Sequence, residues 1–125
     1  MNYLLDTHII LWWLTNPKLI SPKASKIISD KDNNVFVSCA SFWEMAIKKS
    51  LGRLTLPRNI VAILQTEGFQ IMPIGHEEAL GICDMPPLHQ DPFDRMLVMQ
   101  AKLHNCVLIT RDRNVMDYPV ITVKG

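Results

Sequence analysis

The chain has 125 residues, of which 48% are hydrophobic, which suits one folded domain and excludes both two full domains and wholesale disorder. Its 13 Lys and Arg against 12 Asp and Glu leave a formal net charge of +1, so no overall charge draws the protein onto nucleic acid or an anionic membrane. We therefore predict a single domain over residues 1–125 that binds any polyanion through a local site.

The cysteines and the amino-terminal segment indicate the cellular compartment. Cys39, Cys83 and Cys106 are too few for a disulfide framework and lie in apolar runs, which favours buried thiols of a reducing compartment. The apolar first segment lacks a basic leader and carries Asp6 at its centre, which argues against an export signal. No apolar stretch reaches the roughly 20 residues of a membrane span. We expect a cytoplasmic protein without membrane association.

Short apolar runs rich in β-branched residues predict five strands. They lie at Tyr3–Leu5, Val35–Ser38, Phe69–Ile74, Cys106–Thr110 and Val120–Val123. Helical periodicity separates most of these runs. Because parallel neighbours require crossover connections, the alternation predicts an α/β fold, with a mostly parallel five-stranded sheet flanked by helices on both faces.

The helix boundaries carry local signals. A capping residue followed by Pro predicts helix starts at Ser21 and Asp91. The spacing of Ser41 and Glu44 matches a capping box, and Gly52 is placed to end that helix. Two further helices are expected at about Arg58–Glu67 and from near His76 to a point before Pro86.

Four of the acidic residues interrupt or directly follow apolar segments. They are Asp6, Glu44, Asp94 and Asp112. Ligands of parallel α/β sheets collect at the carboxyl ends of the strands, and Asp6 and Asp112 fall just past two such ends. Glu44 and Asp94 fall in the first turns of helices whose preceding loops leave that edge or lie near it. We predict that all four carboxylates converge in one crevice.

Carboxylates gathered in one crevice need a counter-charge. At about 4 Å and an effective dielectric constant near 20, each like-charged pair costs on the order of 4 kcal/mol. Protons with raised pKa values would relieve this repulsion, and so would Mg²⁺ or Mn²⁺, which prefer oxygen ligands. No Cys or His pair has the spacing of zinc ligands. Such ions would activate water against a phosphodiester, which is hydrolytic nuclease chemistry.

Each acid also has a structural interpretation. Glu44 can complete a capping box, Asp94 can interact with the helix dipole, and Asp112 can occupy a turn. Asp91 is better explained as an N-cap. Asp6 is the hardest of the acids to explain by local structure, and together the four favour a site.

Arg95 and Arg111 are each adjacent to a predicted site acid, where a guanidinium group would hold phosphate. One of the neighbouring tryptophans, Trp12 or Trp13, must face away from the core if the leucines that flank them face inward. This predicts an interface in that part of the chain.

Three segments resemble the PIN-domain family and, within it, the VapC-like ribonuclease toxins of bacterial type II toxin–antitoxin modules. The segments are LLDTHIILWWL, SFWEMAIKKSLGRL and HQDPFDRMLVMQAKLHNCVLITRD. The resemblance runs from about Tyr3 to Val123. An ordered Asp, Glu, DPFDR and TRD with an α/β pattern between them is specific in combination, whereas a lone LLDT would be weak evidence.

The resemblance implies a parallel-sheet fold and a Mg²⁺- or Mn²⁺-dependent endoribonuclease that cuts RNA without a covalent intermediate. It also implies a homodimer and an antitoxin protein whose tail occupies the groove of the toxin. We expect that groove to involve the LWWL segment and the helix after Ser41. The implied catalytic and metal-binding residues are Asp6, Glu44, Asp94 and Asp112, with Thr110 near them as a polar neighbour. We expect Arg95, Arg111 and Thr110 to bind the substrate.

Three alternatives remain open. Asp91 precedes Asp94 by three residues, so the two acids can be exchanged by one helical turn, although the spacing to Ala101 favours Asp94. A phosphatase of the haloacid-dehalogenase type also begins with a strand-end Asp, but it needs a second Asp where this chain has His8. A catalytically silent interaction module would keep the fold, and the presence of all four acids argues against it. Nothing in the sequence identifies the RNA that is cut.

Overall fold

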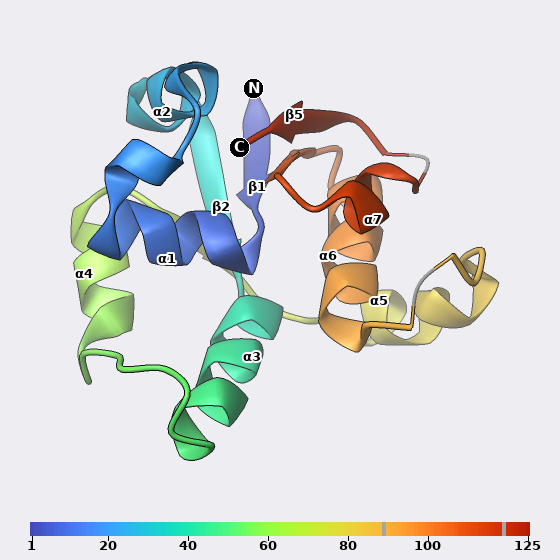
Figure 1. Cartoon of the computed structure of the whole chain (residues 1–125). Helices are drawn as coiled ribbons and strands as arrows, with labels where there is room; N and C mark the ends of the chain where they lie inside the picture. Colours follow the sequence, from blue (N-terminus) through green and yellow to red (C-terminus); the bar gives the residue numbers. More distant parts are fainter. Residues whose placement is uncertain (89, 119) are drawn as a thin grey trace.

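A computed structural model describes residues 1–88, 90–118 and 120–125 (Figure 1). The strands are β1 (Asn2–Leu5), β2 (Asn34–Ser38), β3 (Gln70–Met72), β4 (Val107–Thr110) and β5 (Thr122–Lys124). The helices of the described part are α1 (Thr7–Thr15), α2 (Pro22–Ser29), α3 (Cys39–Ser50), α4 (Ile60–Thr66), α5 (His76–Gly81), α6 (Pro92–Leu103) and α7 (Arg113–Met116), with 3-10 turns η1 (Pro17–Leu19) and η2 (Ile82–Asp84).

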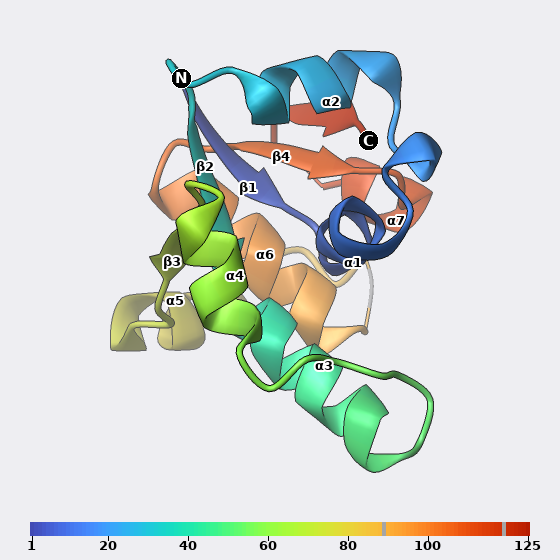
Figure 2. The same ribbon diagram turned by 90° about the vertical axis from the view of Figure 1, so that its left-hand side faces the viewer.

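The strands form one sheet in the order β3-β2-β1-β4-β5, and every neighbouring pair is parallel. The predicted α/β class is confirmed. Figure 2 shows β1 between β2 and β4. Successive strands are added on one side of β1 as far as β3, and the chain then crosses to β4 on the other side. The strand order therefore reverses between β1 and β4, where open parallel sheets form a crevice for ligands.

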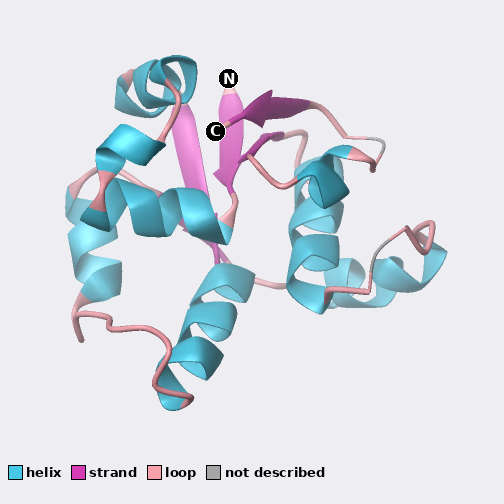
Figure 3. Ribbon diagram, viewed as in Figure 1, coloured by secondary structure: helices cyan, strands magenta, loops and turns pink. Residues whose placement is uncertain are grey.

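Helices cover both faces of the sheet, as predicted (Figures 1 and 3). Side chains alternate along each strand, so Tyr3 and Leu5 of β1 join a core cluster with residues of α1, α2 and α4. Leu4, between them, joins a second cluster with residues of α6 and α7. Burial on both faces explains why the strands are short, continuously apolar runs. The helix α3 lies beyond the carboxyl end of the sheet (Figure 1).

Two of the predicted helix caps are confirmed. The Ser21 hydroxyl accepts a hydrogen bond from the amide of Ala24 at 3.1 Å. The Asp91 carboxylate accepts from the amides of Phe93 and Asp94 at 2.9 and 3.1 Å. Each cap satisfies amides that the first helical turn leaves without intrahelical partners. These local bonds fix the starts of α2 and α6.

The predicted capping box of Ser41 and Glu44 is wrong. The N-cap of α3 is Ser38, whose hydroxyl accepts from the amide of Ala40, because the helix begins directly at the end of β2 with no loop between them. Ser41 is therefore buried inside the helix, where its hydroxyl accepts a hydrogen bond from Thr7. Glu44 lies in the second turn and is not used as a cap.

Other boundaries differ in detail. Strand β3 ends at Met72 because the following Pro73 has no amide to donate to the sheet, and β5 begins at Thr122, two residues later than predicted. The one-turn helix α7 was not predicted. Gly52 ends α3 as expected, with a φ of 73° and backbone bonds from residues 52 and 53 to the carbonyls of residues 49 and 48.

The cysteines and the membrane prediction can be compared with the same structure. Cys106 is buried and Cys39 half-buried, but Cys83 is exposed on η2, so the prediction of three buried thiols is wrong for that residue. Within the described residues, no helix is long and apolar enough to cross a bilayer.

Candidate active site

The predicted acids lie at the carboxyl edge of the sheet or on helices beside it. Asp6 follows β1 directly, and a single residue separates Asp112 from the end of β4. The two acids therefore lie at neighbouring strand ends, where the strand order reverses. Glu44 lies on α3 and Asp94 in the first turn of α6. Helix α1 contacts α3, and α3 in turn contacts α6. The fold therefore brings the four carboxylates to one region.

Thr110, the last residue of β4, ties two of these acids together. Its hydroxyl donates a hydrogen bond of 2.6 Å to Oδ2 of Asp6 and accepts one of 3.1 Å from the amide of Asp112. The side chain is fully buried. Because the hydroxyl has a single proton and donates it to Asp6, Thr110 serves to position carboxylates, a different task from the substrate contact expected of it.

A second buried hydroxyl pair was missed by the sequence reasoning. Thr7, which follows Asp6, donates a hydrogen bond of 2.9 Å to the hydroxyl of Ser41, one turn before Glu44. Both side chains are buried. The pair holds the start of α1 against α3. Its signal in the sequence was the spacing of Ser41 and Glu44, which was interpreted as a cap.

A larger buried network sets α3 against α6, and it too was missed. The hydroxyl of Ser38, which caps α3, also donates to Oε1 of Gln100 on α6. Nε2 of Gln100 donates to Glu78 on α5 at 2.9 Å, and Glu78 pairs with Nε2 of His104 at 2.6 Å. Ser38, Glu78 and Gln100 are all buried. A satisfied buried network of this kind fixes the relative position of the helices that carry Glu44 and Asp94.

The carboxylates influence one another electrostatically. Burial, and after it the charges of neighbouring carboxylates, raise the pKa of Asp94 to about 7. Those neighbours, in order of decreasing effect, are Asp6, Asp91, Asp112 and Glu44. Burial also raises the pKa of Asp6, which is 4% exposed, against the lowering effect of its hydrogen bond from Thr110. The negative charge of the carboxylates is therefore not balanced by the basic side chains near them.

The remaining contacts separate site acids from capping acids. Asp91 is exposed and accepts from two amides of its own helix, which favours Asp94 over Asp91 as the site residue. Asp112 accepts from the amide of Asn114 through Oδ1 and thereby caps α7. The capping bond uses Oδ1, so capping α7 does not prevent Oδ2 of Asp112 from serving as a ligand. Glu44 forms an ion pair with Lys48 at 3.0 Å.

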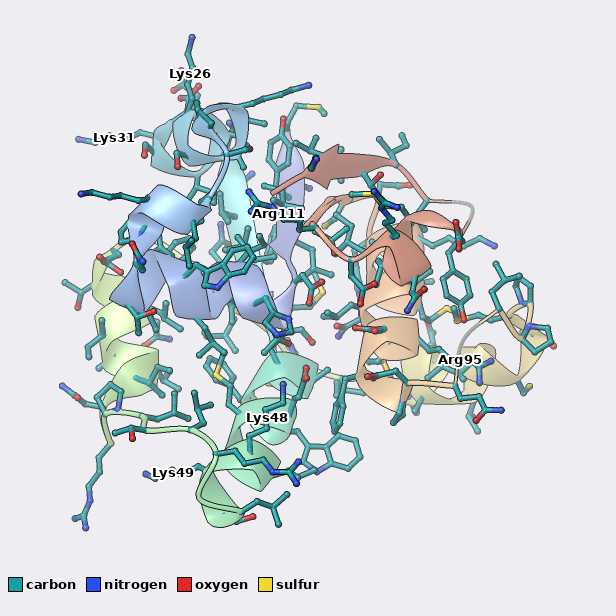
Figure 4. All side chains as sticks on the ribbon, viewed as in Figure 1. Lys26, Lys31, Lys48, Lys49, Arg95 and Arg111 are labelled. Carbon is teal, nitrogen blue, oxygen red and sulfur yellow. The ribbon has the colours of Figure 1, made fainter. Side chains whose placement is uncertain are left out.

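The two predicted arginines lie far apart (Figure 4). Arg111 donates from Nε and Nη2 to the carbonyl oxygen of Gly125, and its guanidinium lies 5.1 Å from the ring centre of Trp12. Arg95 instead points toward η2, where Nη2 donates to the carbonyl of Ile82 at 3.1 Å. The structure does not bring Arg95 to the carboxylates, because adjacency to Asp94 along a helix places it on a different face.

An open pocket of about 290 Å³ adjoins the acids. It is lined by Asp6, His8, Trp12, Arg111 and Asp112. His8 and Trp12 were not assigned to the site from the sequence, although both lie in the segment that follows Asp6. Their rings face each other with centres 6.2 Å apart and planes tilted by 49°.

The donor atoms suit a hard cation. The four acids offer only oxygen, which is the ligand that Mg²⁺ and Mn²⁺ prefer. In residues 1–88, 90–118 and 120–125, no three side chains of His, Cys, Asp or Glu are spaced as ligands of one ion.

Comparisons with known proteins identify the family of the chain. The PIN domain family matches residues 3–120. The chain is 27% identical to Ribonuclease VapC22 of Mycobacterium tuberculosis over 118 residues, which cover 92% of this chain and 90% of that protein.

Two solved structures have a similar fold. One is VapBC2 from Rickettsia felis bound to a DNA fragment from their promoter, with a TM-score of 0.73, 14% identity and 98% of both chains covered. The other is a toxin-antitoxin complex from Klebsiella pneumoniae, with a TM-score of 0.66, 18% identity, and 98% of this chain and 96% of that chain covered. Because the family match spans nearly the whole chain, from within β1 to two residues before β5, this protein belongs to the PIN-domain family.

Proposed function

We propose that this protein is an endoribonuclease that requires Mg²⁺ or Mn²⁺ and acts as the toxin of a toxin–antitoxin pair in the cytoplasm. The observation that carries the proposal is the pair of acids at adjacent strand ends, Asp6 and Asp112, joined through the buried Thr110 hydroxyl. The similarity to Ribonuclease VapC22 supports RNA as the substrate.

Asp6, Glu44, Asp94 and Asp112 would hold the metal ion. A bound divalent ion would supply Lewis-acid stabilisation of the phosphodiester and a water of lowered pKa. The protein's own residues orient the ligands: Thr110 holds one oxygen of Asp6, and the α7 cap holds one oxygen of Asp112. With a pKa of about 7, Asp94 is partly protonated at neutral pH, so metal binding is expected to release a proton.

Metal dependence is expected to be complete. Purified protein incubated with end-labelled single-stranded RNA should produce discrete fragments in Mg²⁺ or Mn²⁺ and none in excess EDTA, because the clustered carboxylates carry the chemistry only with a counter-charge. Restoring Mg²⁺ to the chelated sample serves as the control. Undiminished cleavage in EDTA would contradict the metal-dependent reading.

The same assay separates the proposal from its alternatives. A catalytically silent PIN-fold module would leave RNA intact whichever divalent metal ion is added. A phosphatase of the haloacid-dehalogenase type would release inorganic phosphate from a small phosphomonoester and leave internal phosphodiester bonds uncut.

We also propose an antitoxin partner and a homodimer, and of the two halves of the predicted groove the LWWL segment is the less exposed. Trp13 packs edge-on against Phe69 with ring centres 5.9 Å apart, and Trp12 lies under Arg111. The other half of the predicted groove, α3 and the residue that ends it, carries an exposed apolar face. It consists of Trp43, which is 57% exposed, with Ile47 and Leu51. The spacing of four residues places these three side chains on one side of the helix.

Trp43→Ser and Leu51→Ser are each expected to weaken antitoxin binding at least tenfold, because exposed aromatic and aliphatic anchors dominate protein interfaces. The measurement is titration of the purified toxin with the small protein encoded beside it. Leu80→Ser, which alters a 72% exposed residue on α5, is the matched control. Unchanged binding by both α3 variants would place the antitoxin elsewhere.

A further inference from the structure

We propose that Gln100 is a positioning residue of the metal site, because its side chain ties α6, which carries Asp94, to the start of α3, which carries Glu44. The inference rests on the proposed function and deepens it by naming a residue outside the carboxylates on which metal binding depends. Gln100 is fully buried and lies six residues after Asp94 on the same helix. It therefore acts through the position of the helix and not as a ligand.

The amide of Gln100 is hydrogen-bonded at both ends to other parts of the chain. Its Oε1 accepts from the hydroxyl of Ser38, the N-cap of α3. Its Nε2 donates to Oε2 of Glu78 on α5 at 2.9 Å and to the carbonyl of Pro73, just after β3, at 3.3 Å. Both N–H groups of the amide thus have acceptors and its oxygen has a donor. This one side chain links α6 to α3, to α5 and to the end of β3.

The charge of Glu78 fixes the direction of these hydrogen bonds. Burial acts to raise the pKa of Glu78, but hydrogen bonds from three donors, of which His104 has the largest effect, lower it below its ordinary value. An ionised carboxylate can only accept hydrogen bonds, so Gln100 must turn its NH₂ group toward Glu78 and its oxygen toward Ser38. The hydroxyl proton of Ser38 is then committed to Gln100, and its oxygen accepts from the amide of Ala40 at 3.0 Å. The hydrogen bonds from Glu78 to α3 therefore have one possible direction.

The link through Gln100 opposes the repulsion between the carboxylates that the two helices carry. Burial, and after it the charges of neighbouring acids that include Glu44, raise the pKa of Asp94, so without a cation these acids push α3 and α6 apart. Helix α3 begins directly at the end of β2, and the hydrogen bond from Ser38 holds this first turn against α6. Without that bond the helices can separate, and carboxylates that lie farther apart bind a divalent cation more weakly.

The test measures metal binding in the absence of RNA. Mn²⁺ is titrated into the purified protein, and free Mn²⁺ is followed by its electron paramagnetic resonance signal. Gln100→Met keeps an unbranched side chain of similar size but has no amide, and it should raise the dissociation constant for Mn²⁺ about tenfold. Lys102→Met, which places the same side chain at an exposed position of α6, should leave the constant unchanged. Circular dichroism at the temperature of the titration establishes that each variant is folded.

Ser38→Ala breaks the same link from the side of α3, and it also removes the cap of that helix. Ser21→Ala removes the cap of α2 without touching the link, so it measures the effect of losing a cap alone. Ser38→Ala should weaken Mn²⁺ binding about tenfold, and Ser21→Ala should not weaken it. Because Ser38 and Gln100 form one link, the double variant Ser38→Ala/Gln100→Met should also lose about tenfold and not about a hundredfold.

Cleavage of RNA adds a readout that a general loss of structure would not give. Gln100→Met should raise the Mn²⁺ concentration for half-maximal rate about tenfold. The rate at saturating Mn²⁺ should change less than threefold, because the bound cation removes the repulsion that the link opposes.

Wild-type Mn²⁺ affinity in both Gln100→Met and Ser38→Ala would overturn the inference. A hundredfold loss in the double variant would also overturn it, because the two residues would then act independently. If Gln100→Met does not fold, Ser38→Ala decides alone against Ser21→Ala. If the wild type binds Mn²⁺ and cleaves RNA but the variants match it, the proposed function stands without the Gln100 link. If the wild type binds no Mn²⁺, the metal site and the inference fail together.

Discussion

Asp6→Asn is expected to lower the rate of RNA cleavage at least 100-fold. Asp6 follows the central strand, is buried, and accepts a hydrogen bond from Thr110 through Oδ2. Asn preserves the shape and can still accept the hydrogen bond from Thr110, so the substitution removes charge without opening a cavity. The measurement is the initial rate of cleavage of a labelled RNA in Mg²⁺ under single-turnover conditions.

Asp30→Asn is the control for this substitution. Asp30 lies in the exposed turn after α2, where its carboxylate accepts from the amide of Asp32, a bond that Asn also makes. Its cleavage rate should equal that of the wild type. Full activity of Asp6→Asn, with Asp30→Asn unchanged, would remove Asp6 from the metal-binding set.

Asp94→Asn is expected to raise the melting temperature in EDTA at pH 8 by about 3–5 °C. Burial and the surrounding carboxylates disfavour the charged form of Asp94 and raise its pKa to about 7, so ionisation of this residue opposes folding above that pH. Allowing for solvent screening at a partly exposed group, the penalty relieved is about 1 kcal/mol, which corresponds to a shift of this size in a domain of this length. The loss of a favourable first-turn charge offsets a few tenths of it.

The direction of the pH dependence follows from the pKa in each state. In the unfolded chain Asp94 has a pKa of about 3.9, and in the folded protein about 7. Below about pH 4 both states are protonated and no penalty exists. As the pH rises toward 7 the folded state retains a proton that the unfolded state has lost, so stability falls, and above 7 the penalty is constant. Wild type and variant should therefore melt together at pH 4 and separate progressively up to pH 8.

Mg²⁺ provides the matching control, because a ligand that binds only the folded state stabilises it by mass action. It should raise the melting temperature of the wild type more than that of Asp94→Asn. Identical melting curves at pH 8, with and without Mg²⁺, would show that Asp94 is only a helix-start residue.

The sequence was most informative where local pattern and position in the sheet coincide. Asp6 and Asp112 could be placed because apolar runs end immediately before them, and the caps at Ser21 and Asp91 could be placed because a Pro follows each. The start of α3 could not, because Ser38 and Ser41 are both good caps, and the choice depends on contacts with residues far along the chain.

The directions in which side chains point were the second feature that could not be predicted from the sequence. Arg95 and Arg111 look equivalent beside their acids in the sequence, yet a helix turns the first toward η2 while the end of a strand leaves the second over Trp12. The same ambiguity affected the adjacent tryptophans. Trp12 and Trp13 are both half-buried beside a neighbouring charged or aromatic side chain, whereas Trp43 is 57% exposed although its ring lies 5.0 Å from that of Phe93.

The central place of β1 also governs when the protein becomes able to act. Asp6 and Thr110 are separated by 104 residues, and β1 receives its β4 neighbour only after most of the chain has been synthesised. A nascent chain that has formed β1, β2 and β3 has neither the Thr110 hydroxyl nor Asp112 beside Asp6. Contacts this distant in sequence form late in folding because closing the intervening loop is entropically costly. The pair of acids on which the proposed function depends is therefore assembled only when synthesis is almost complete.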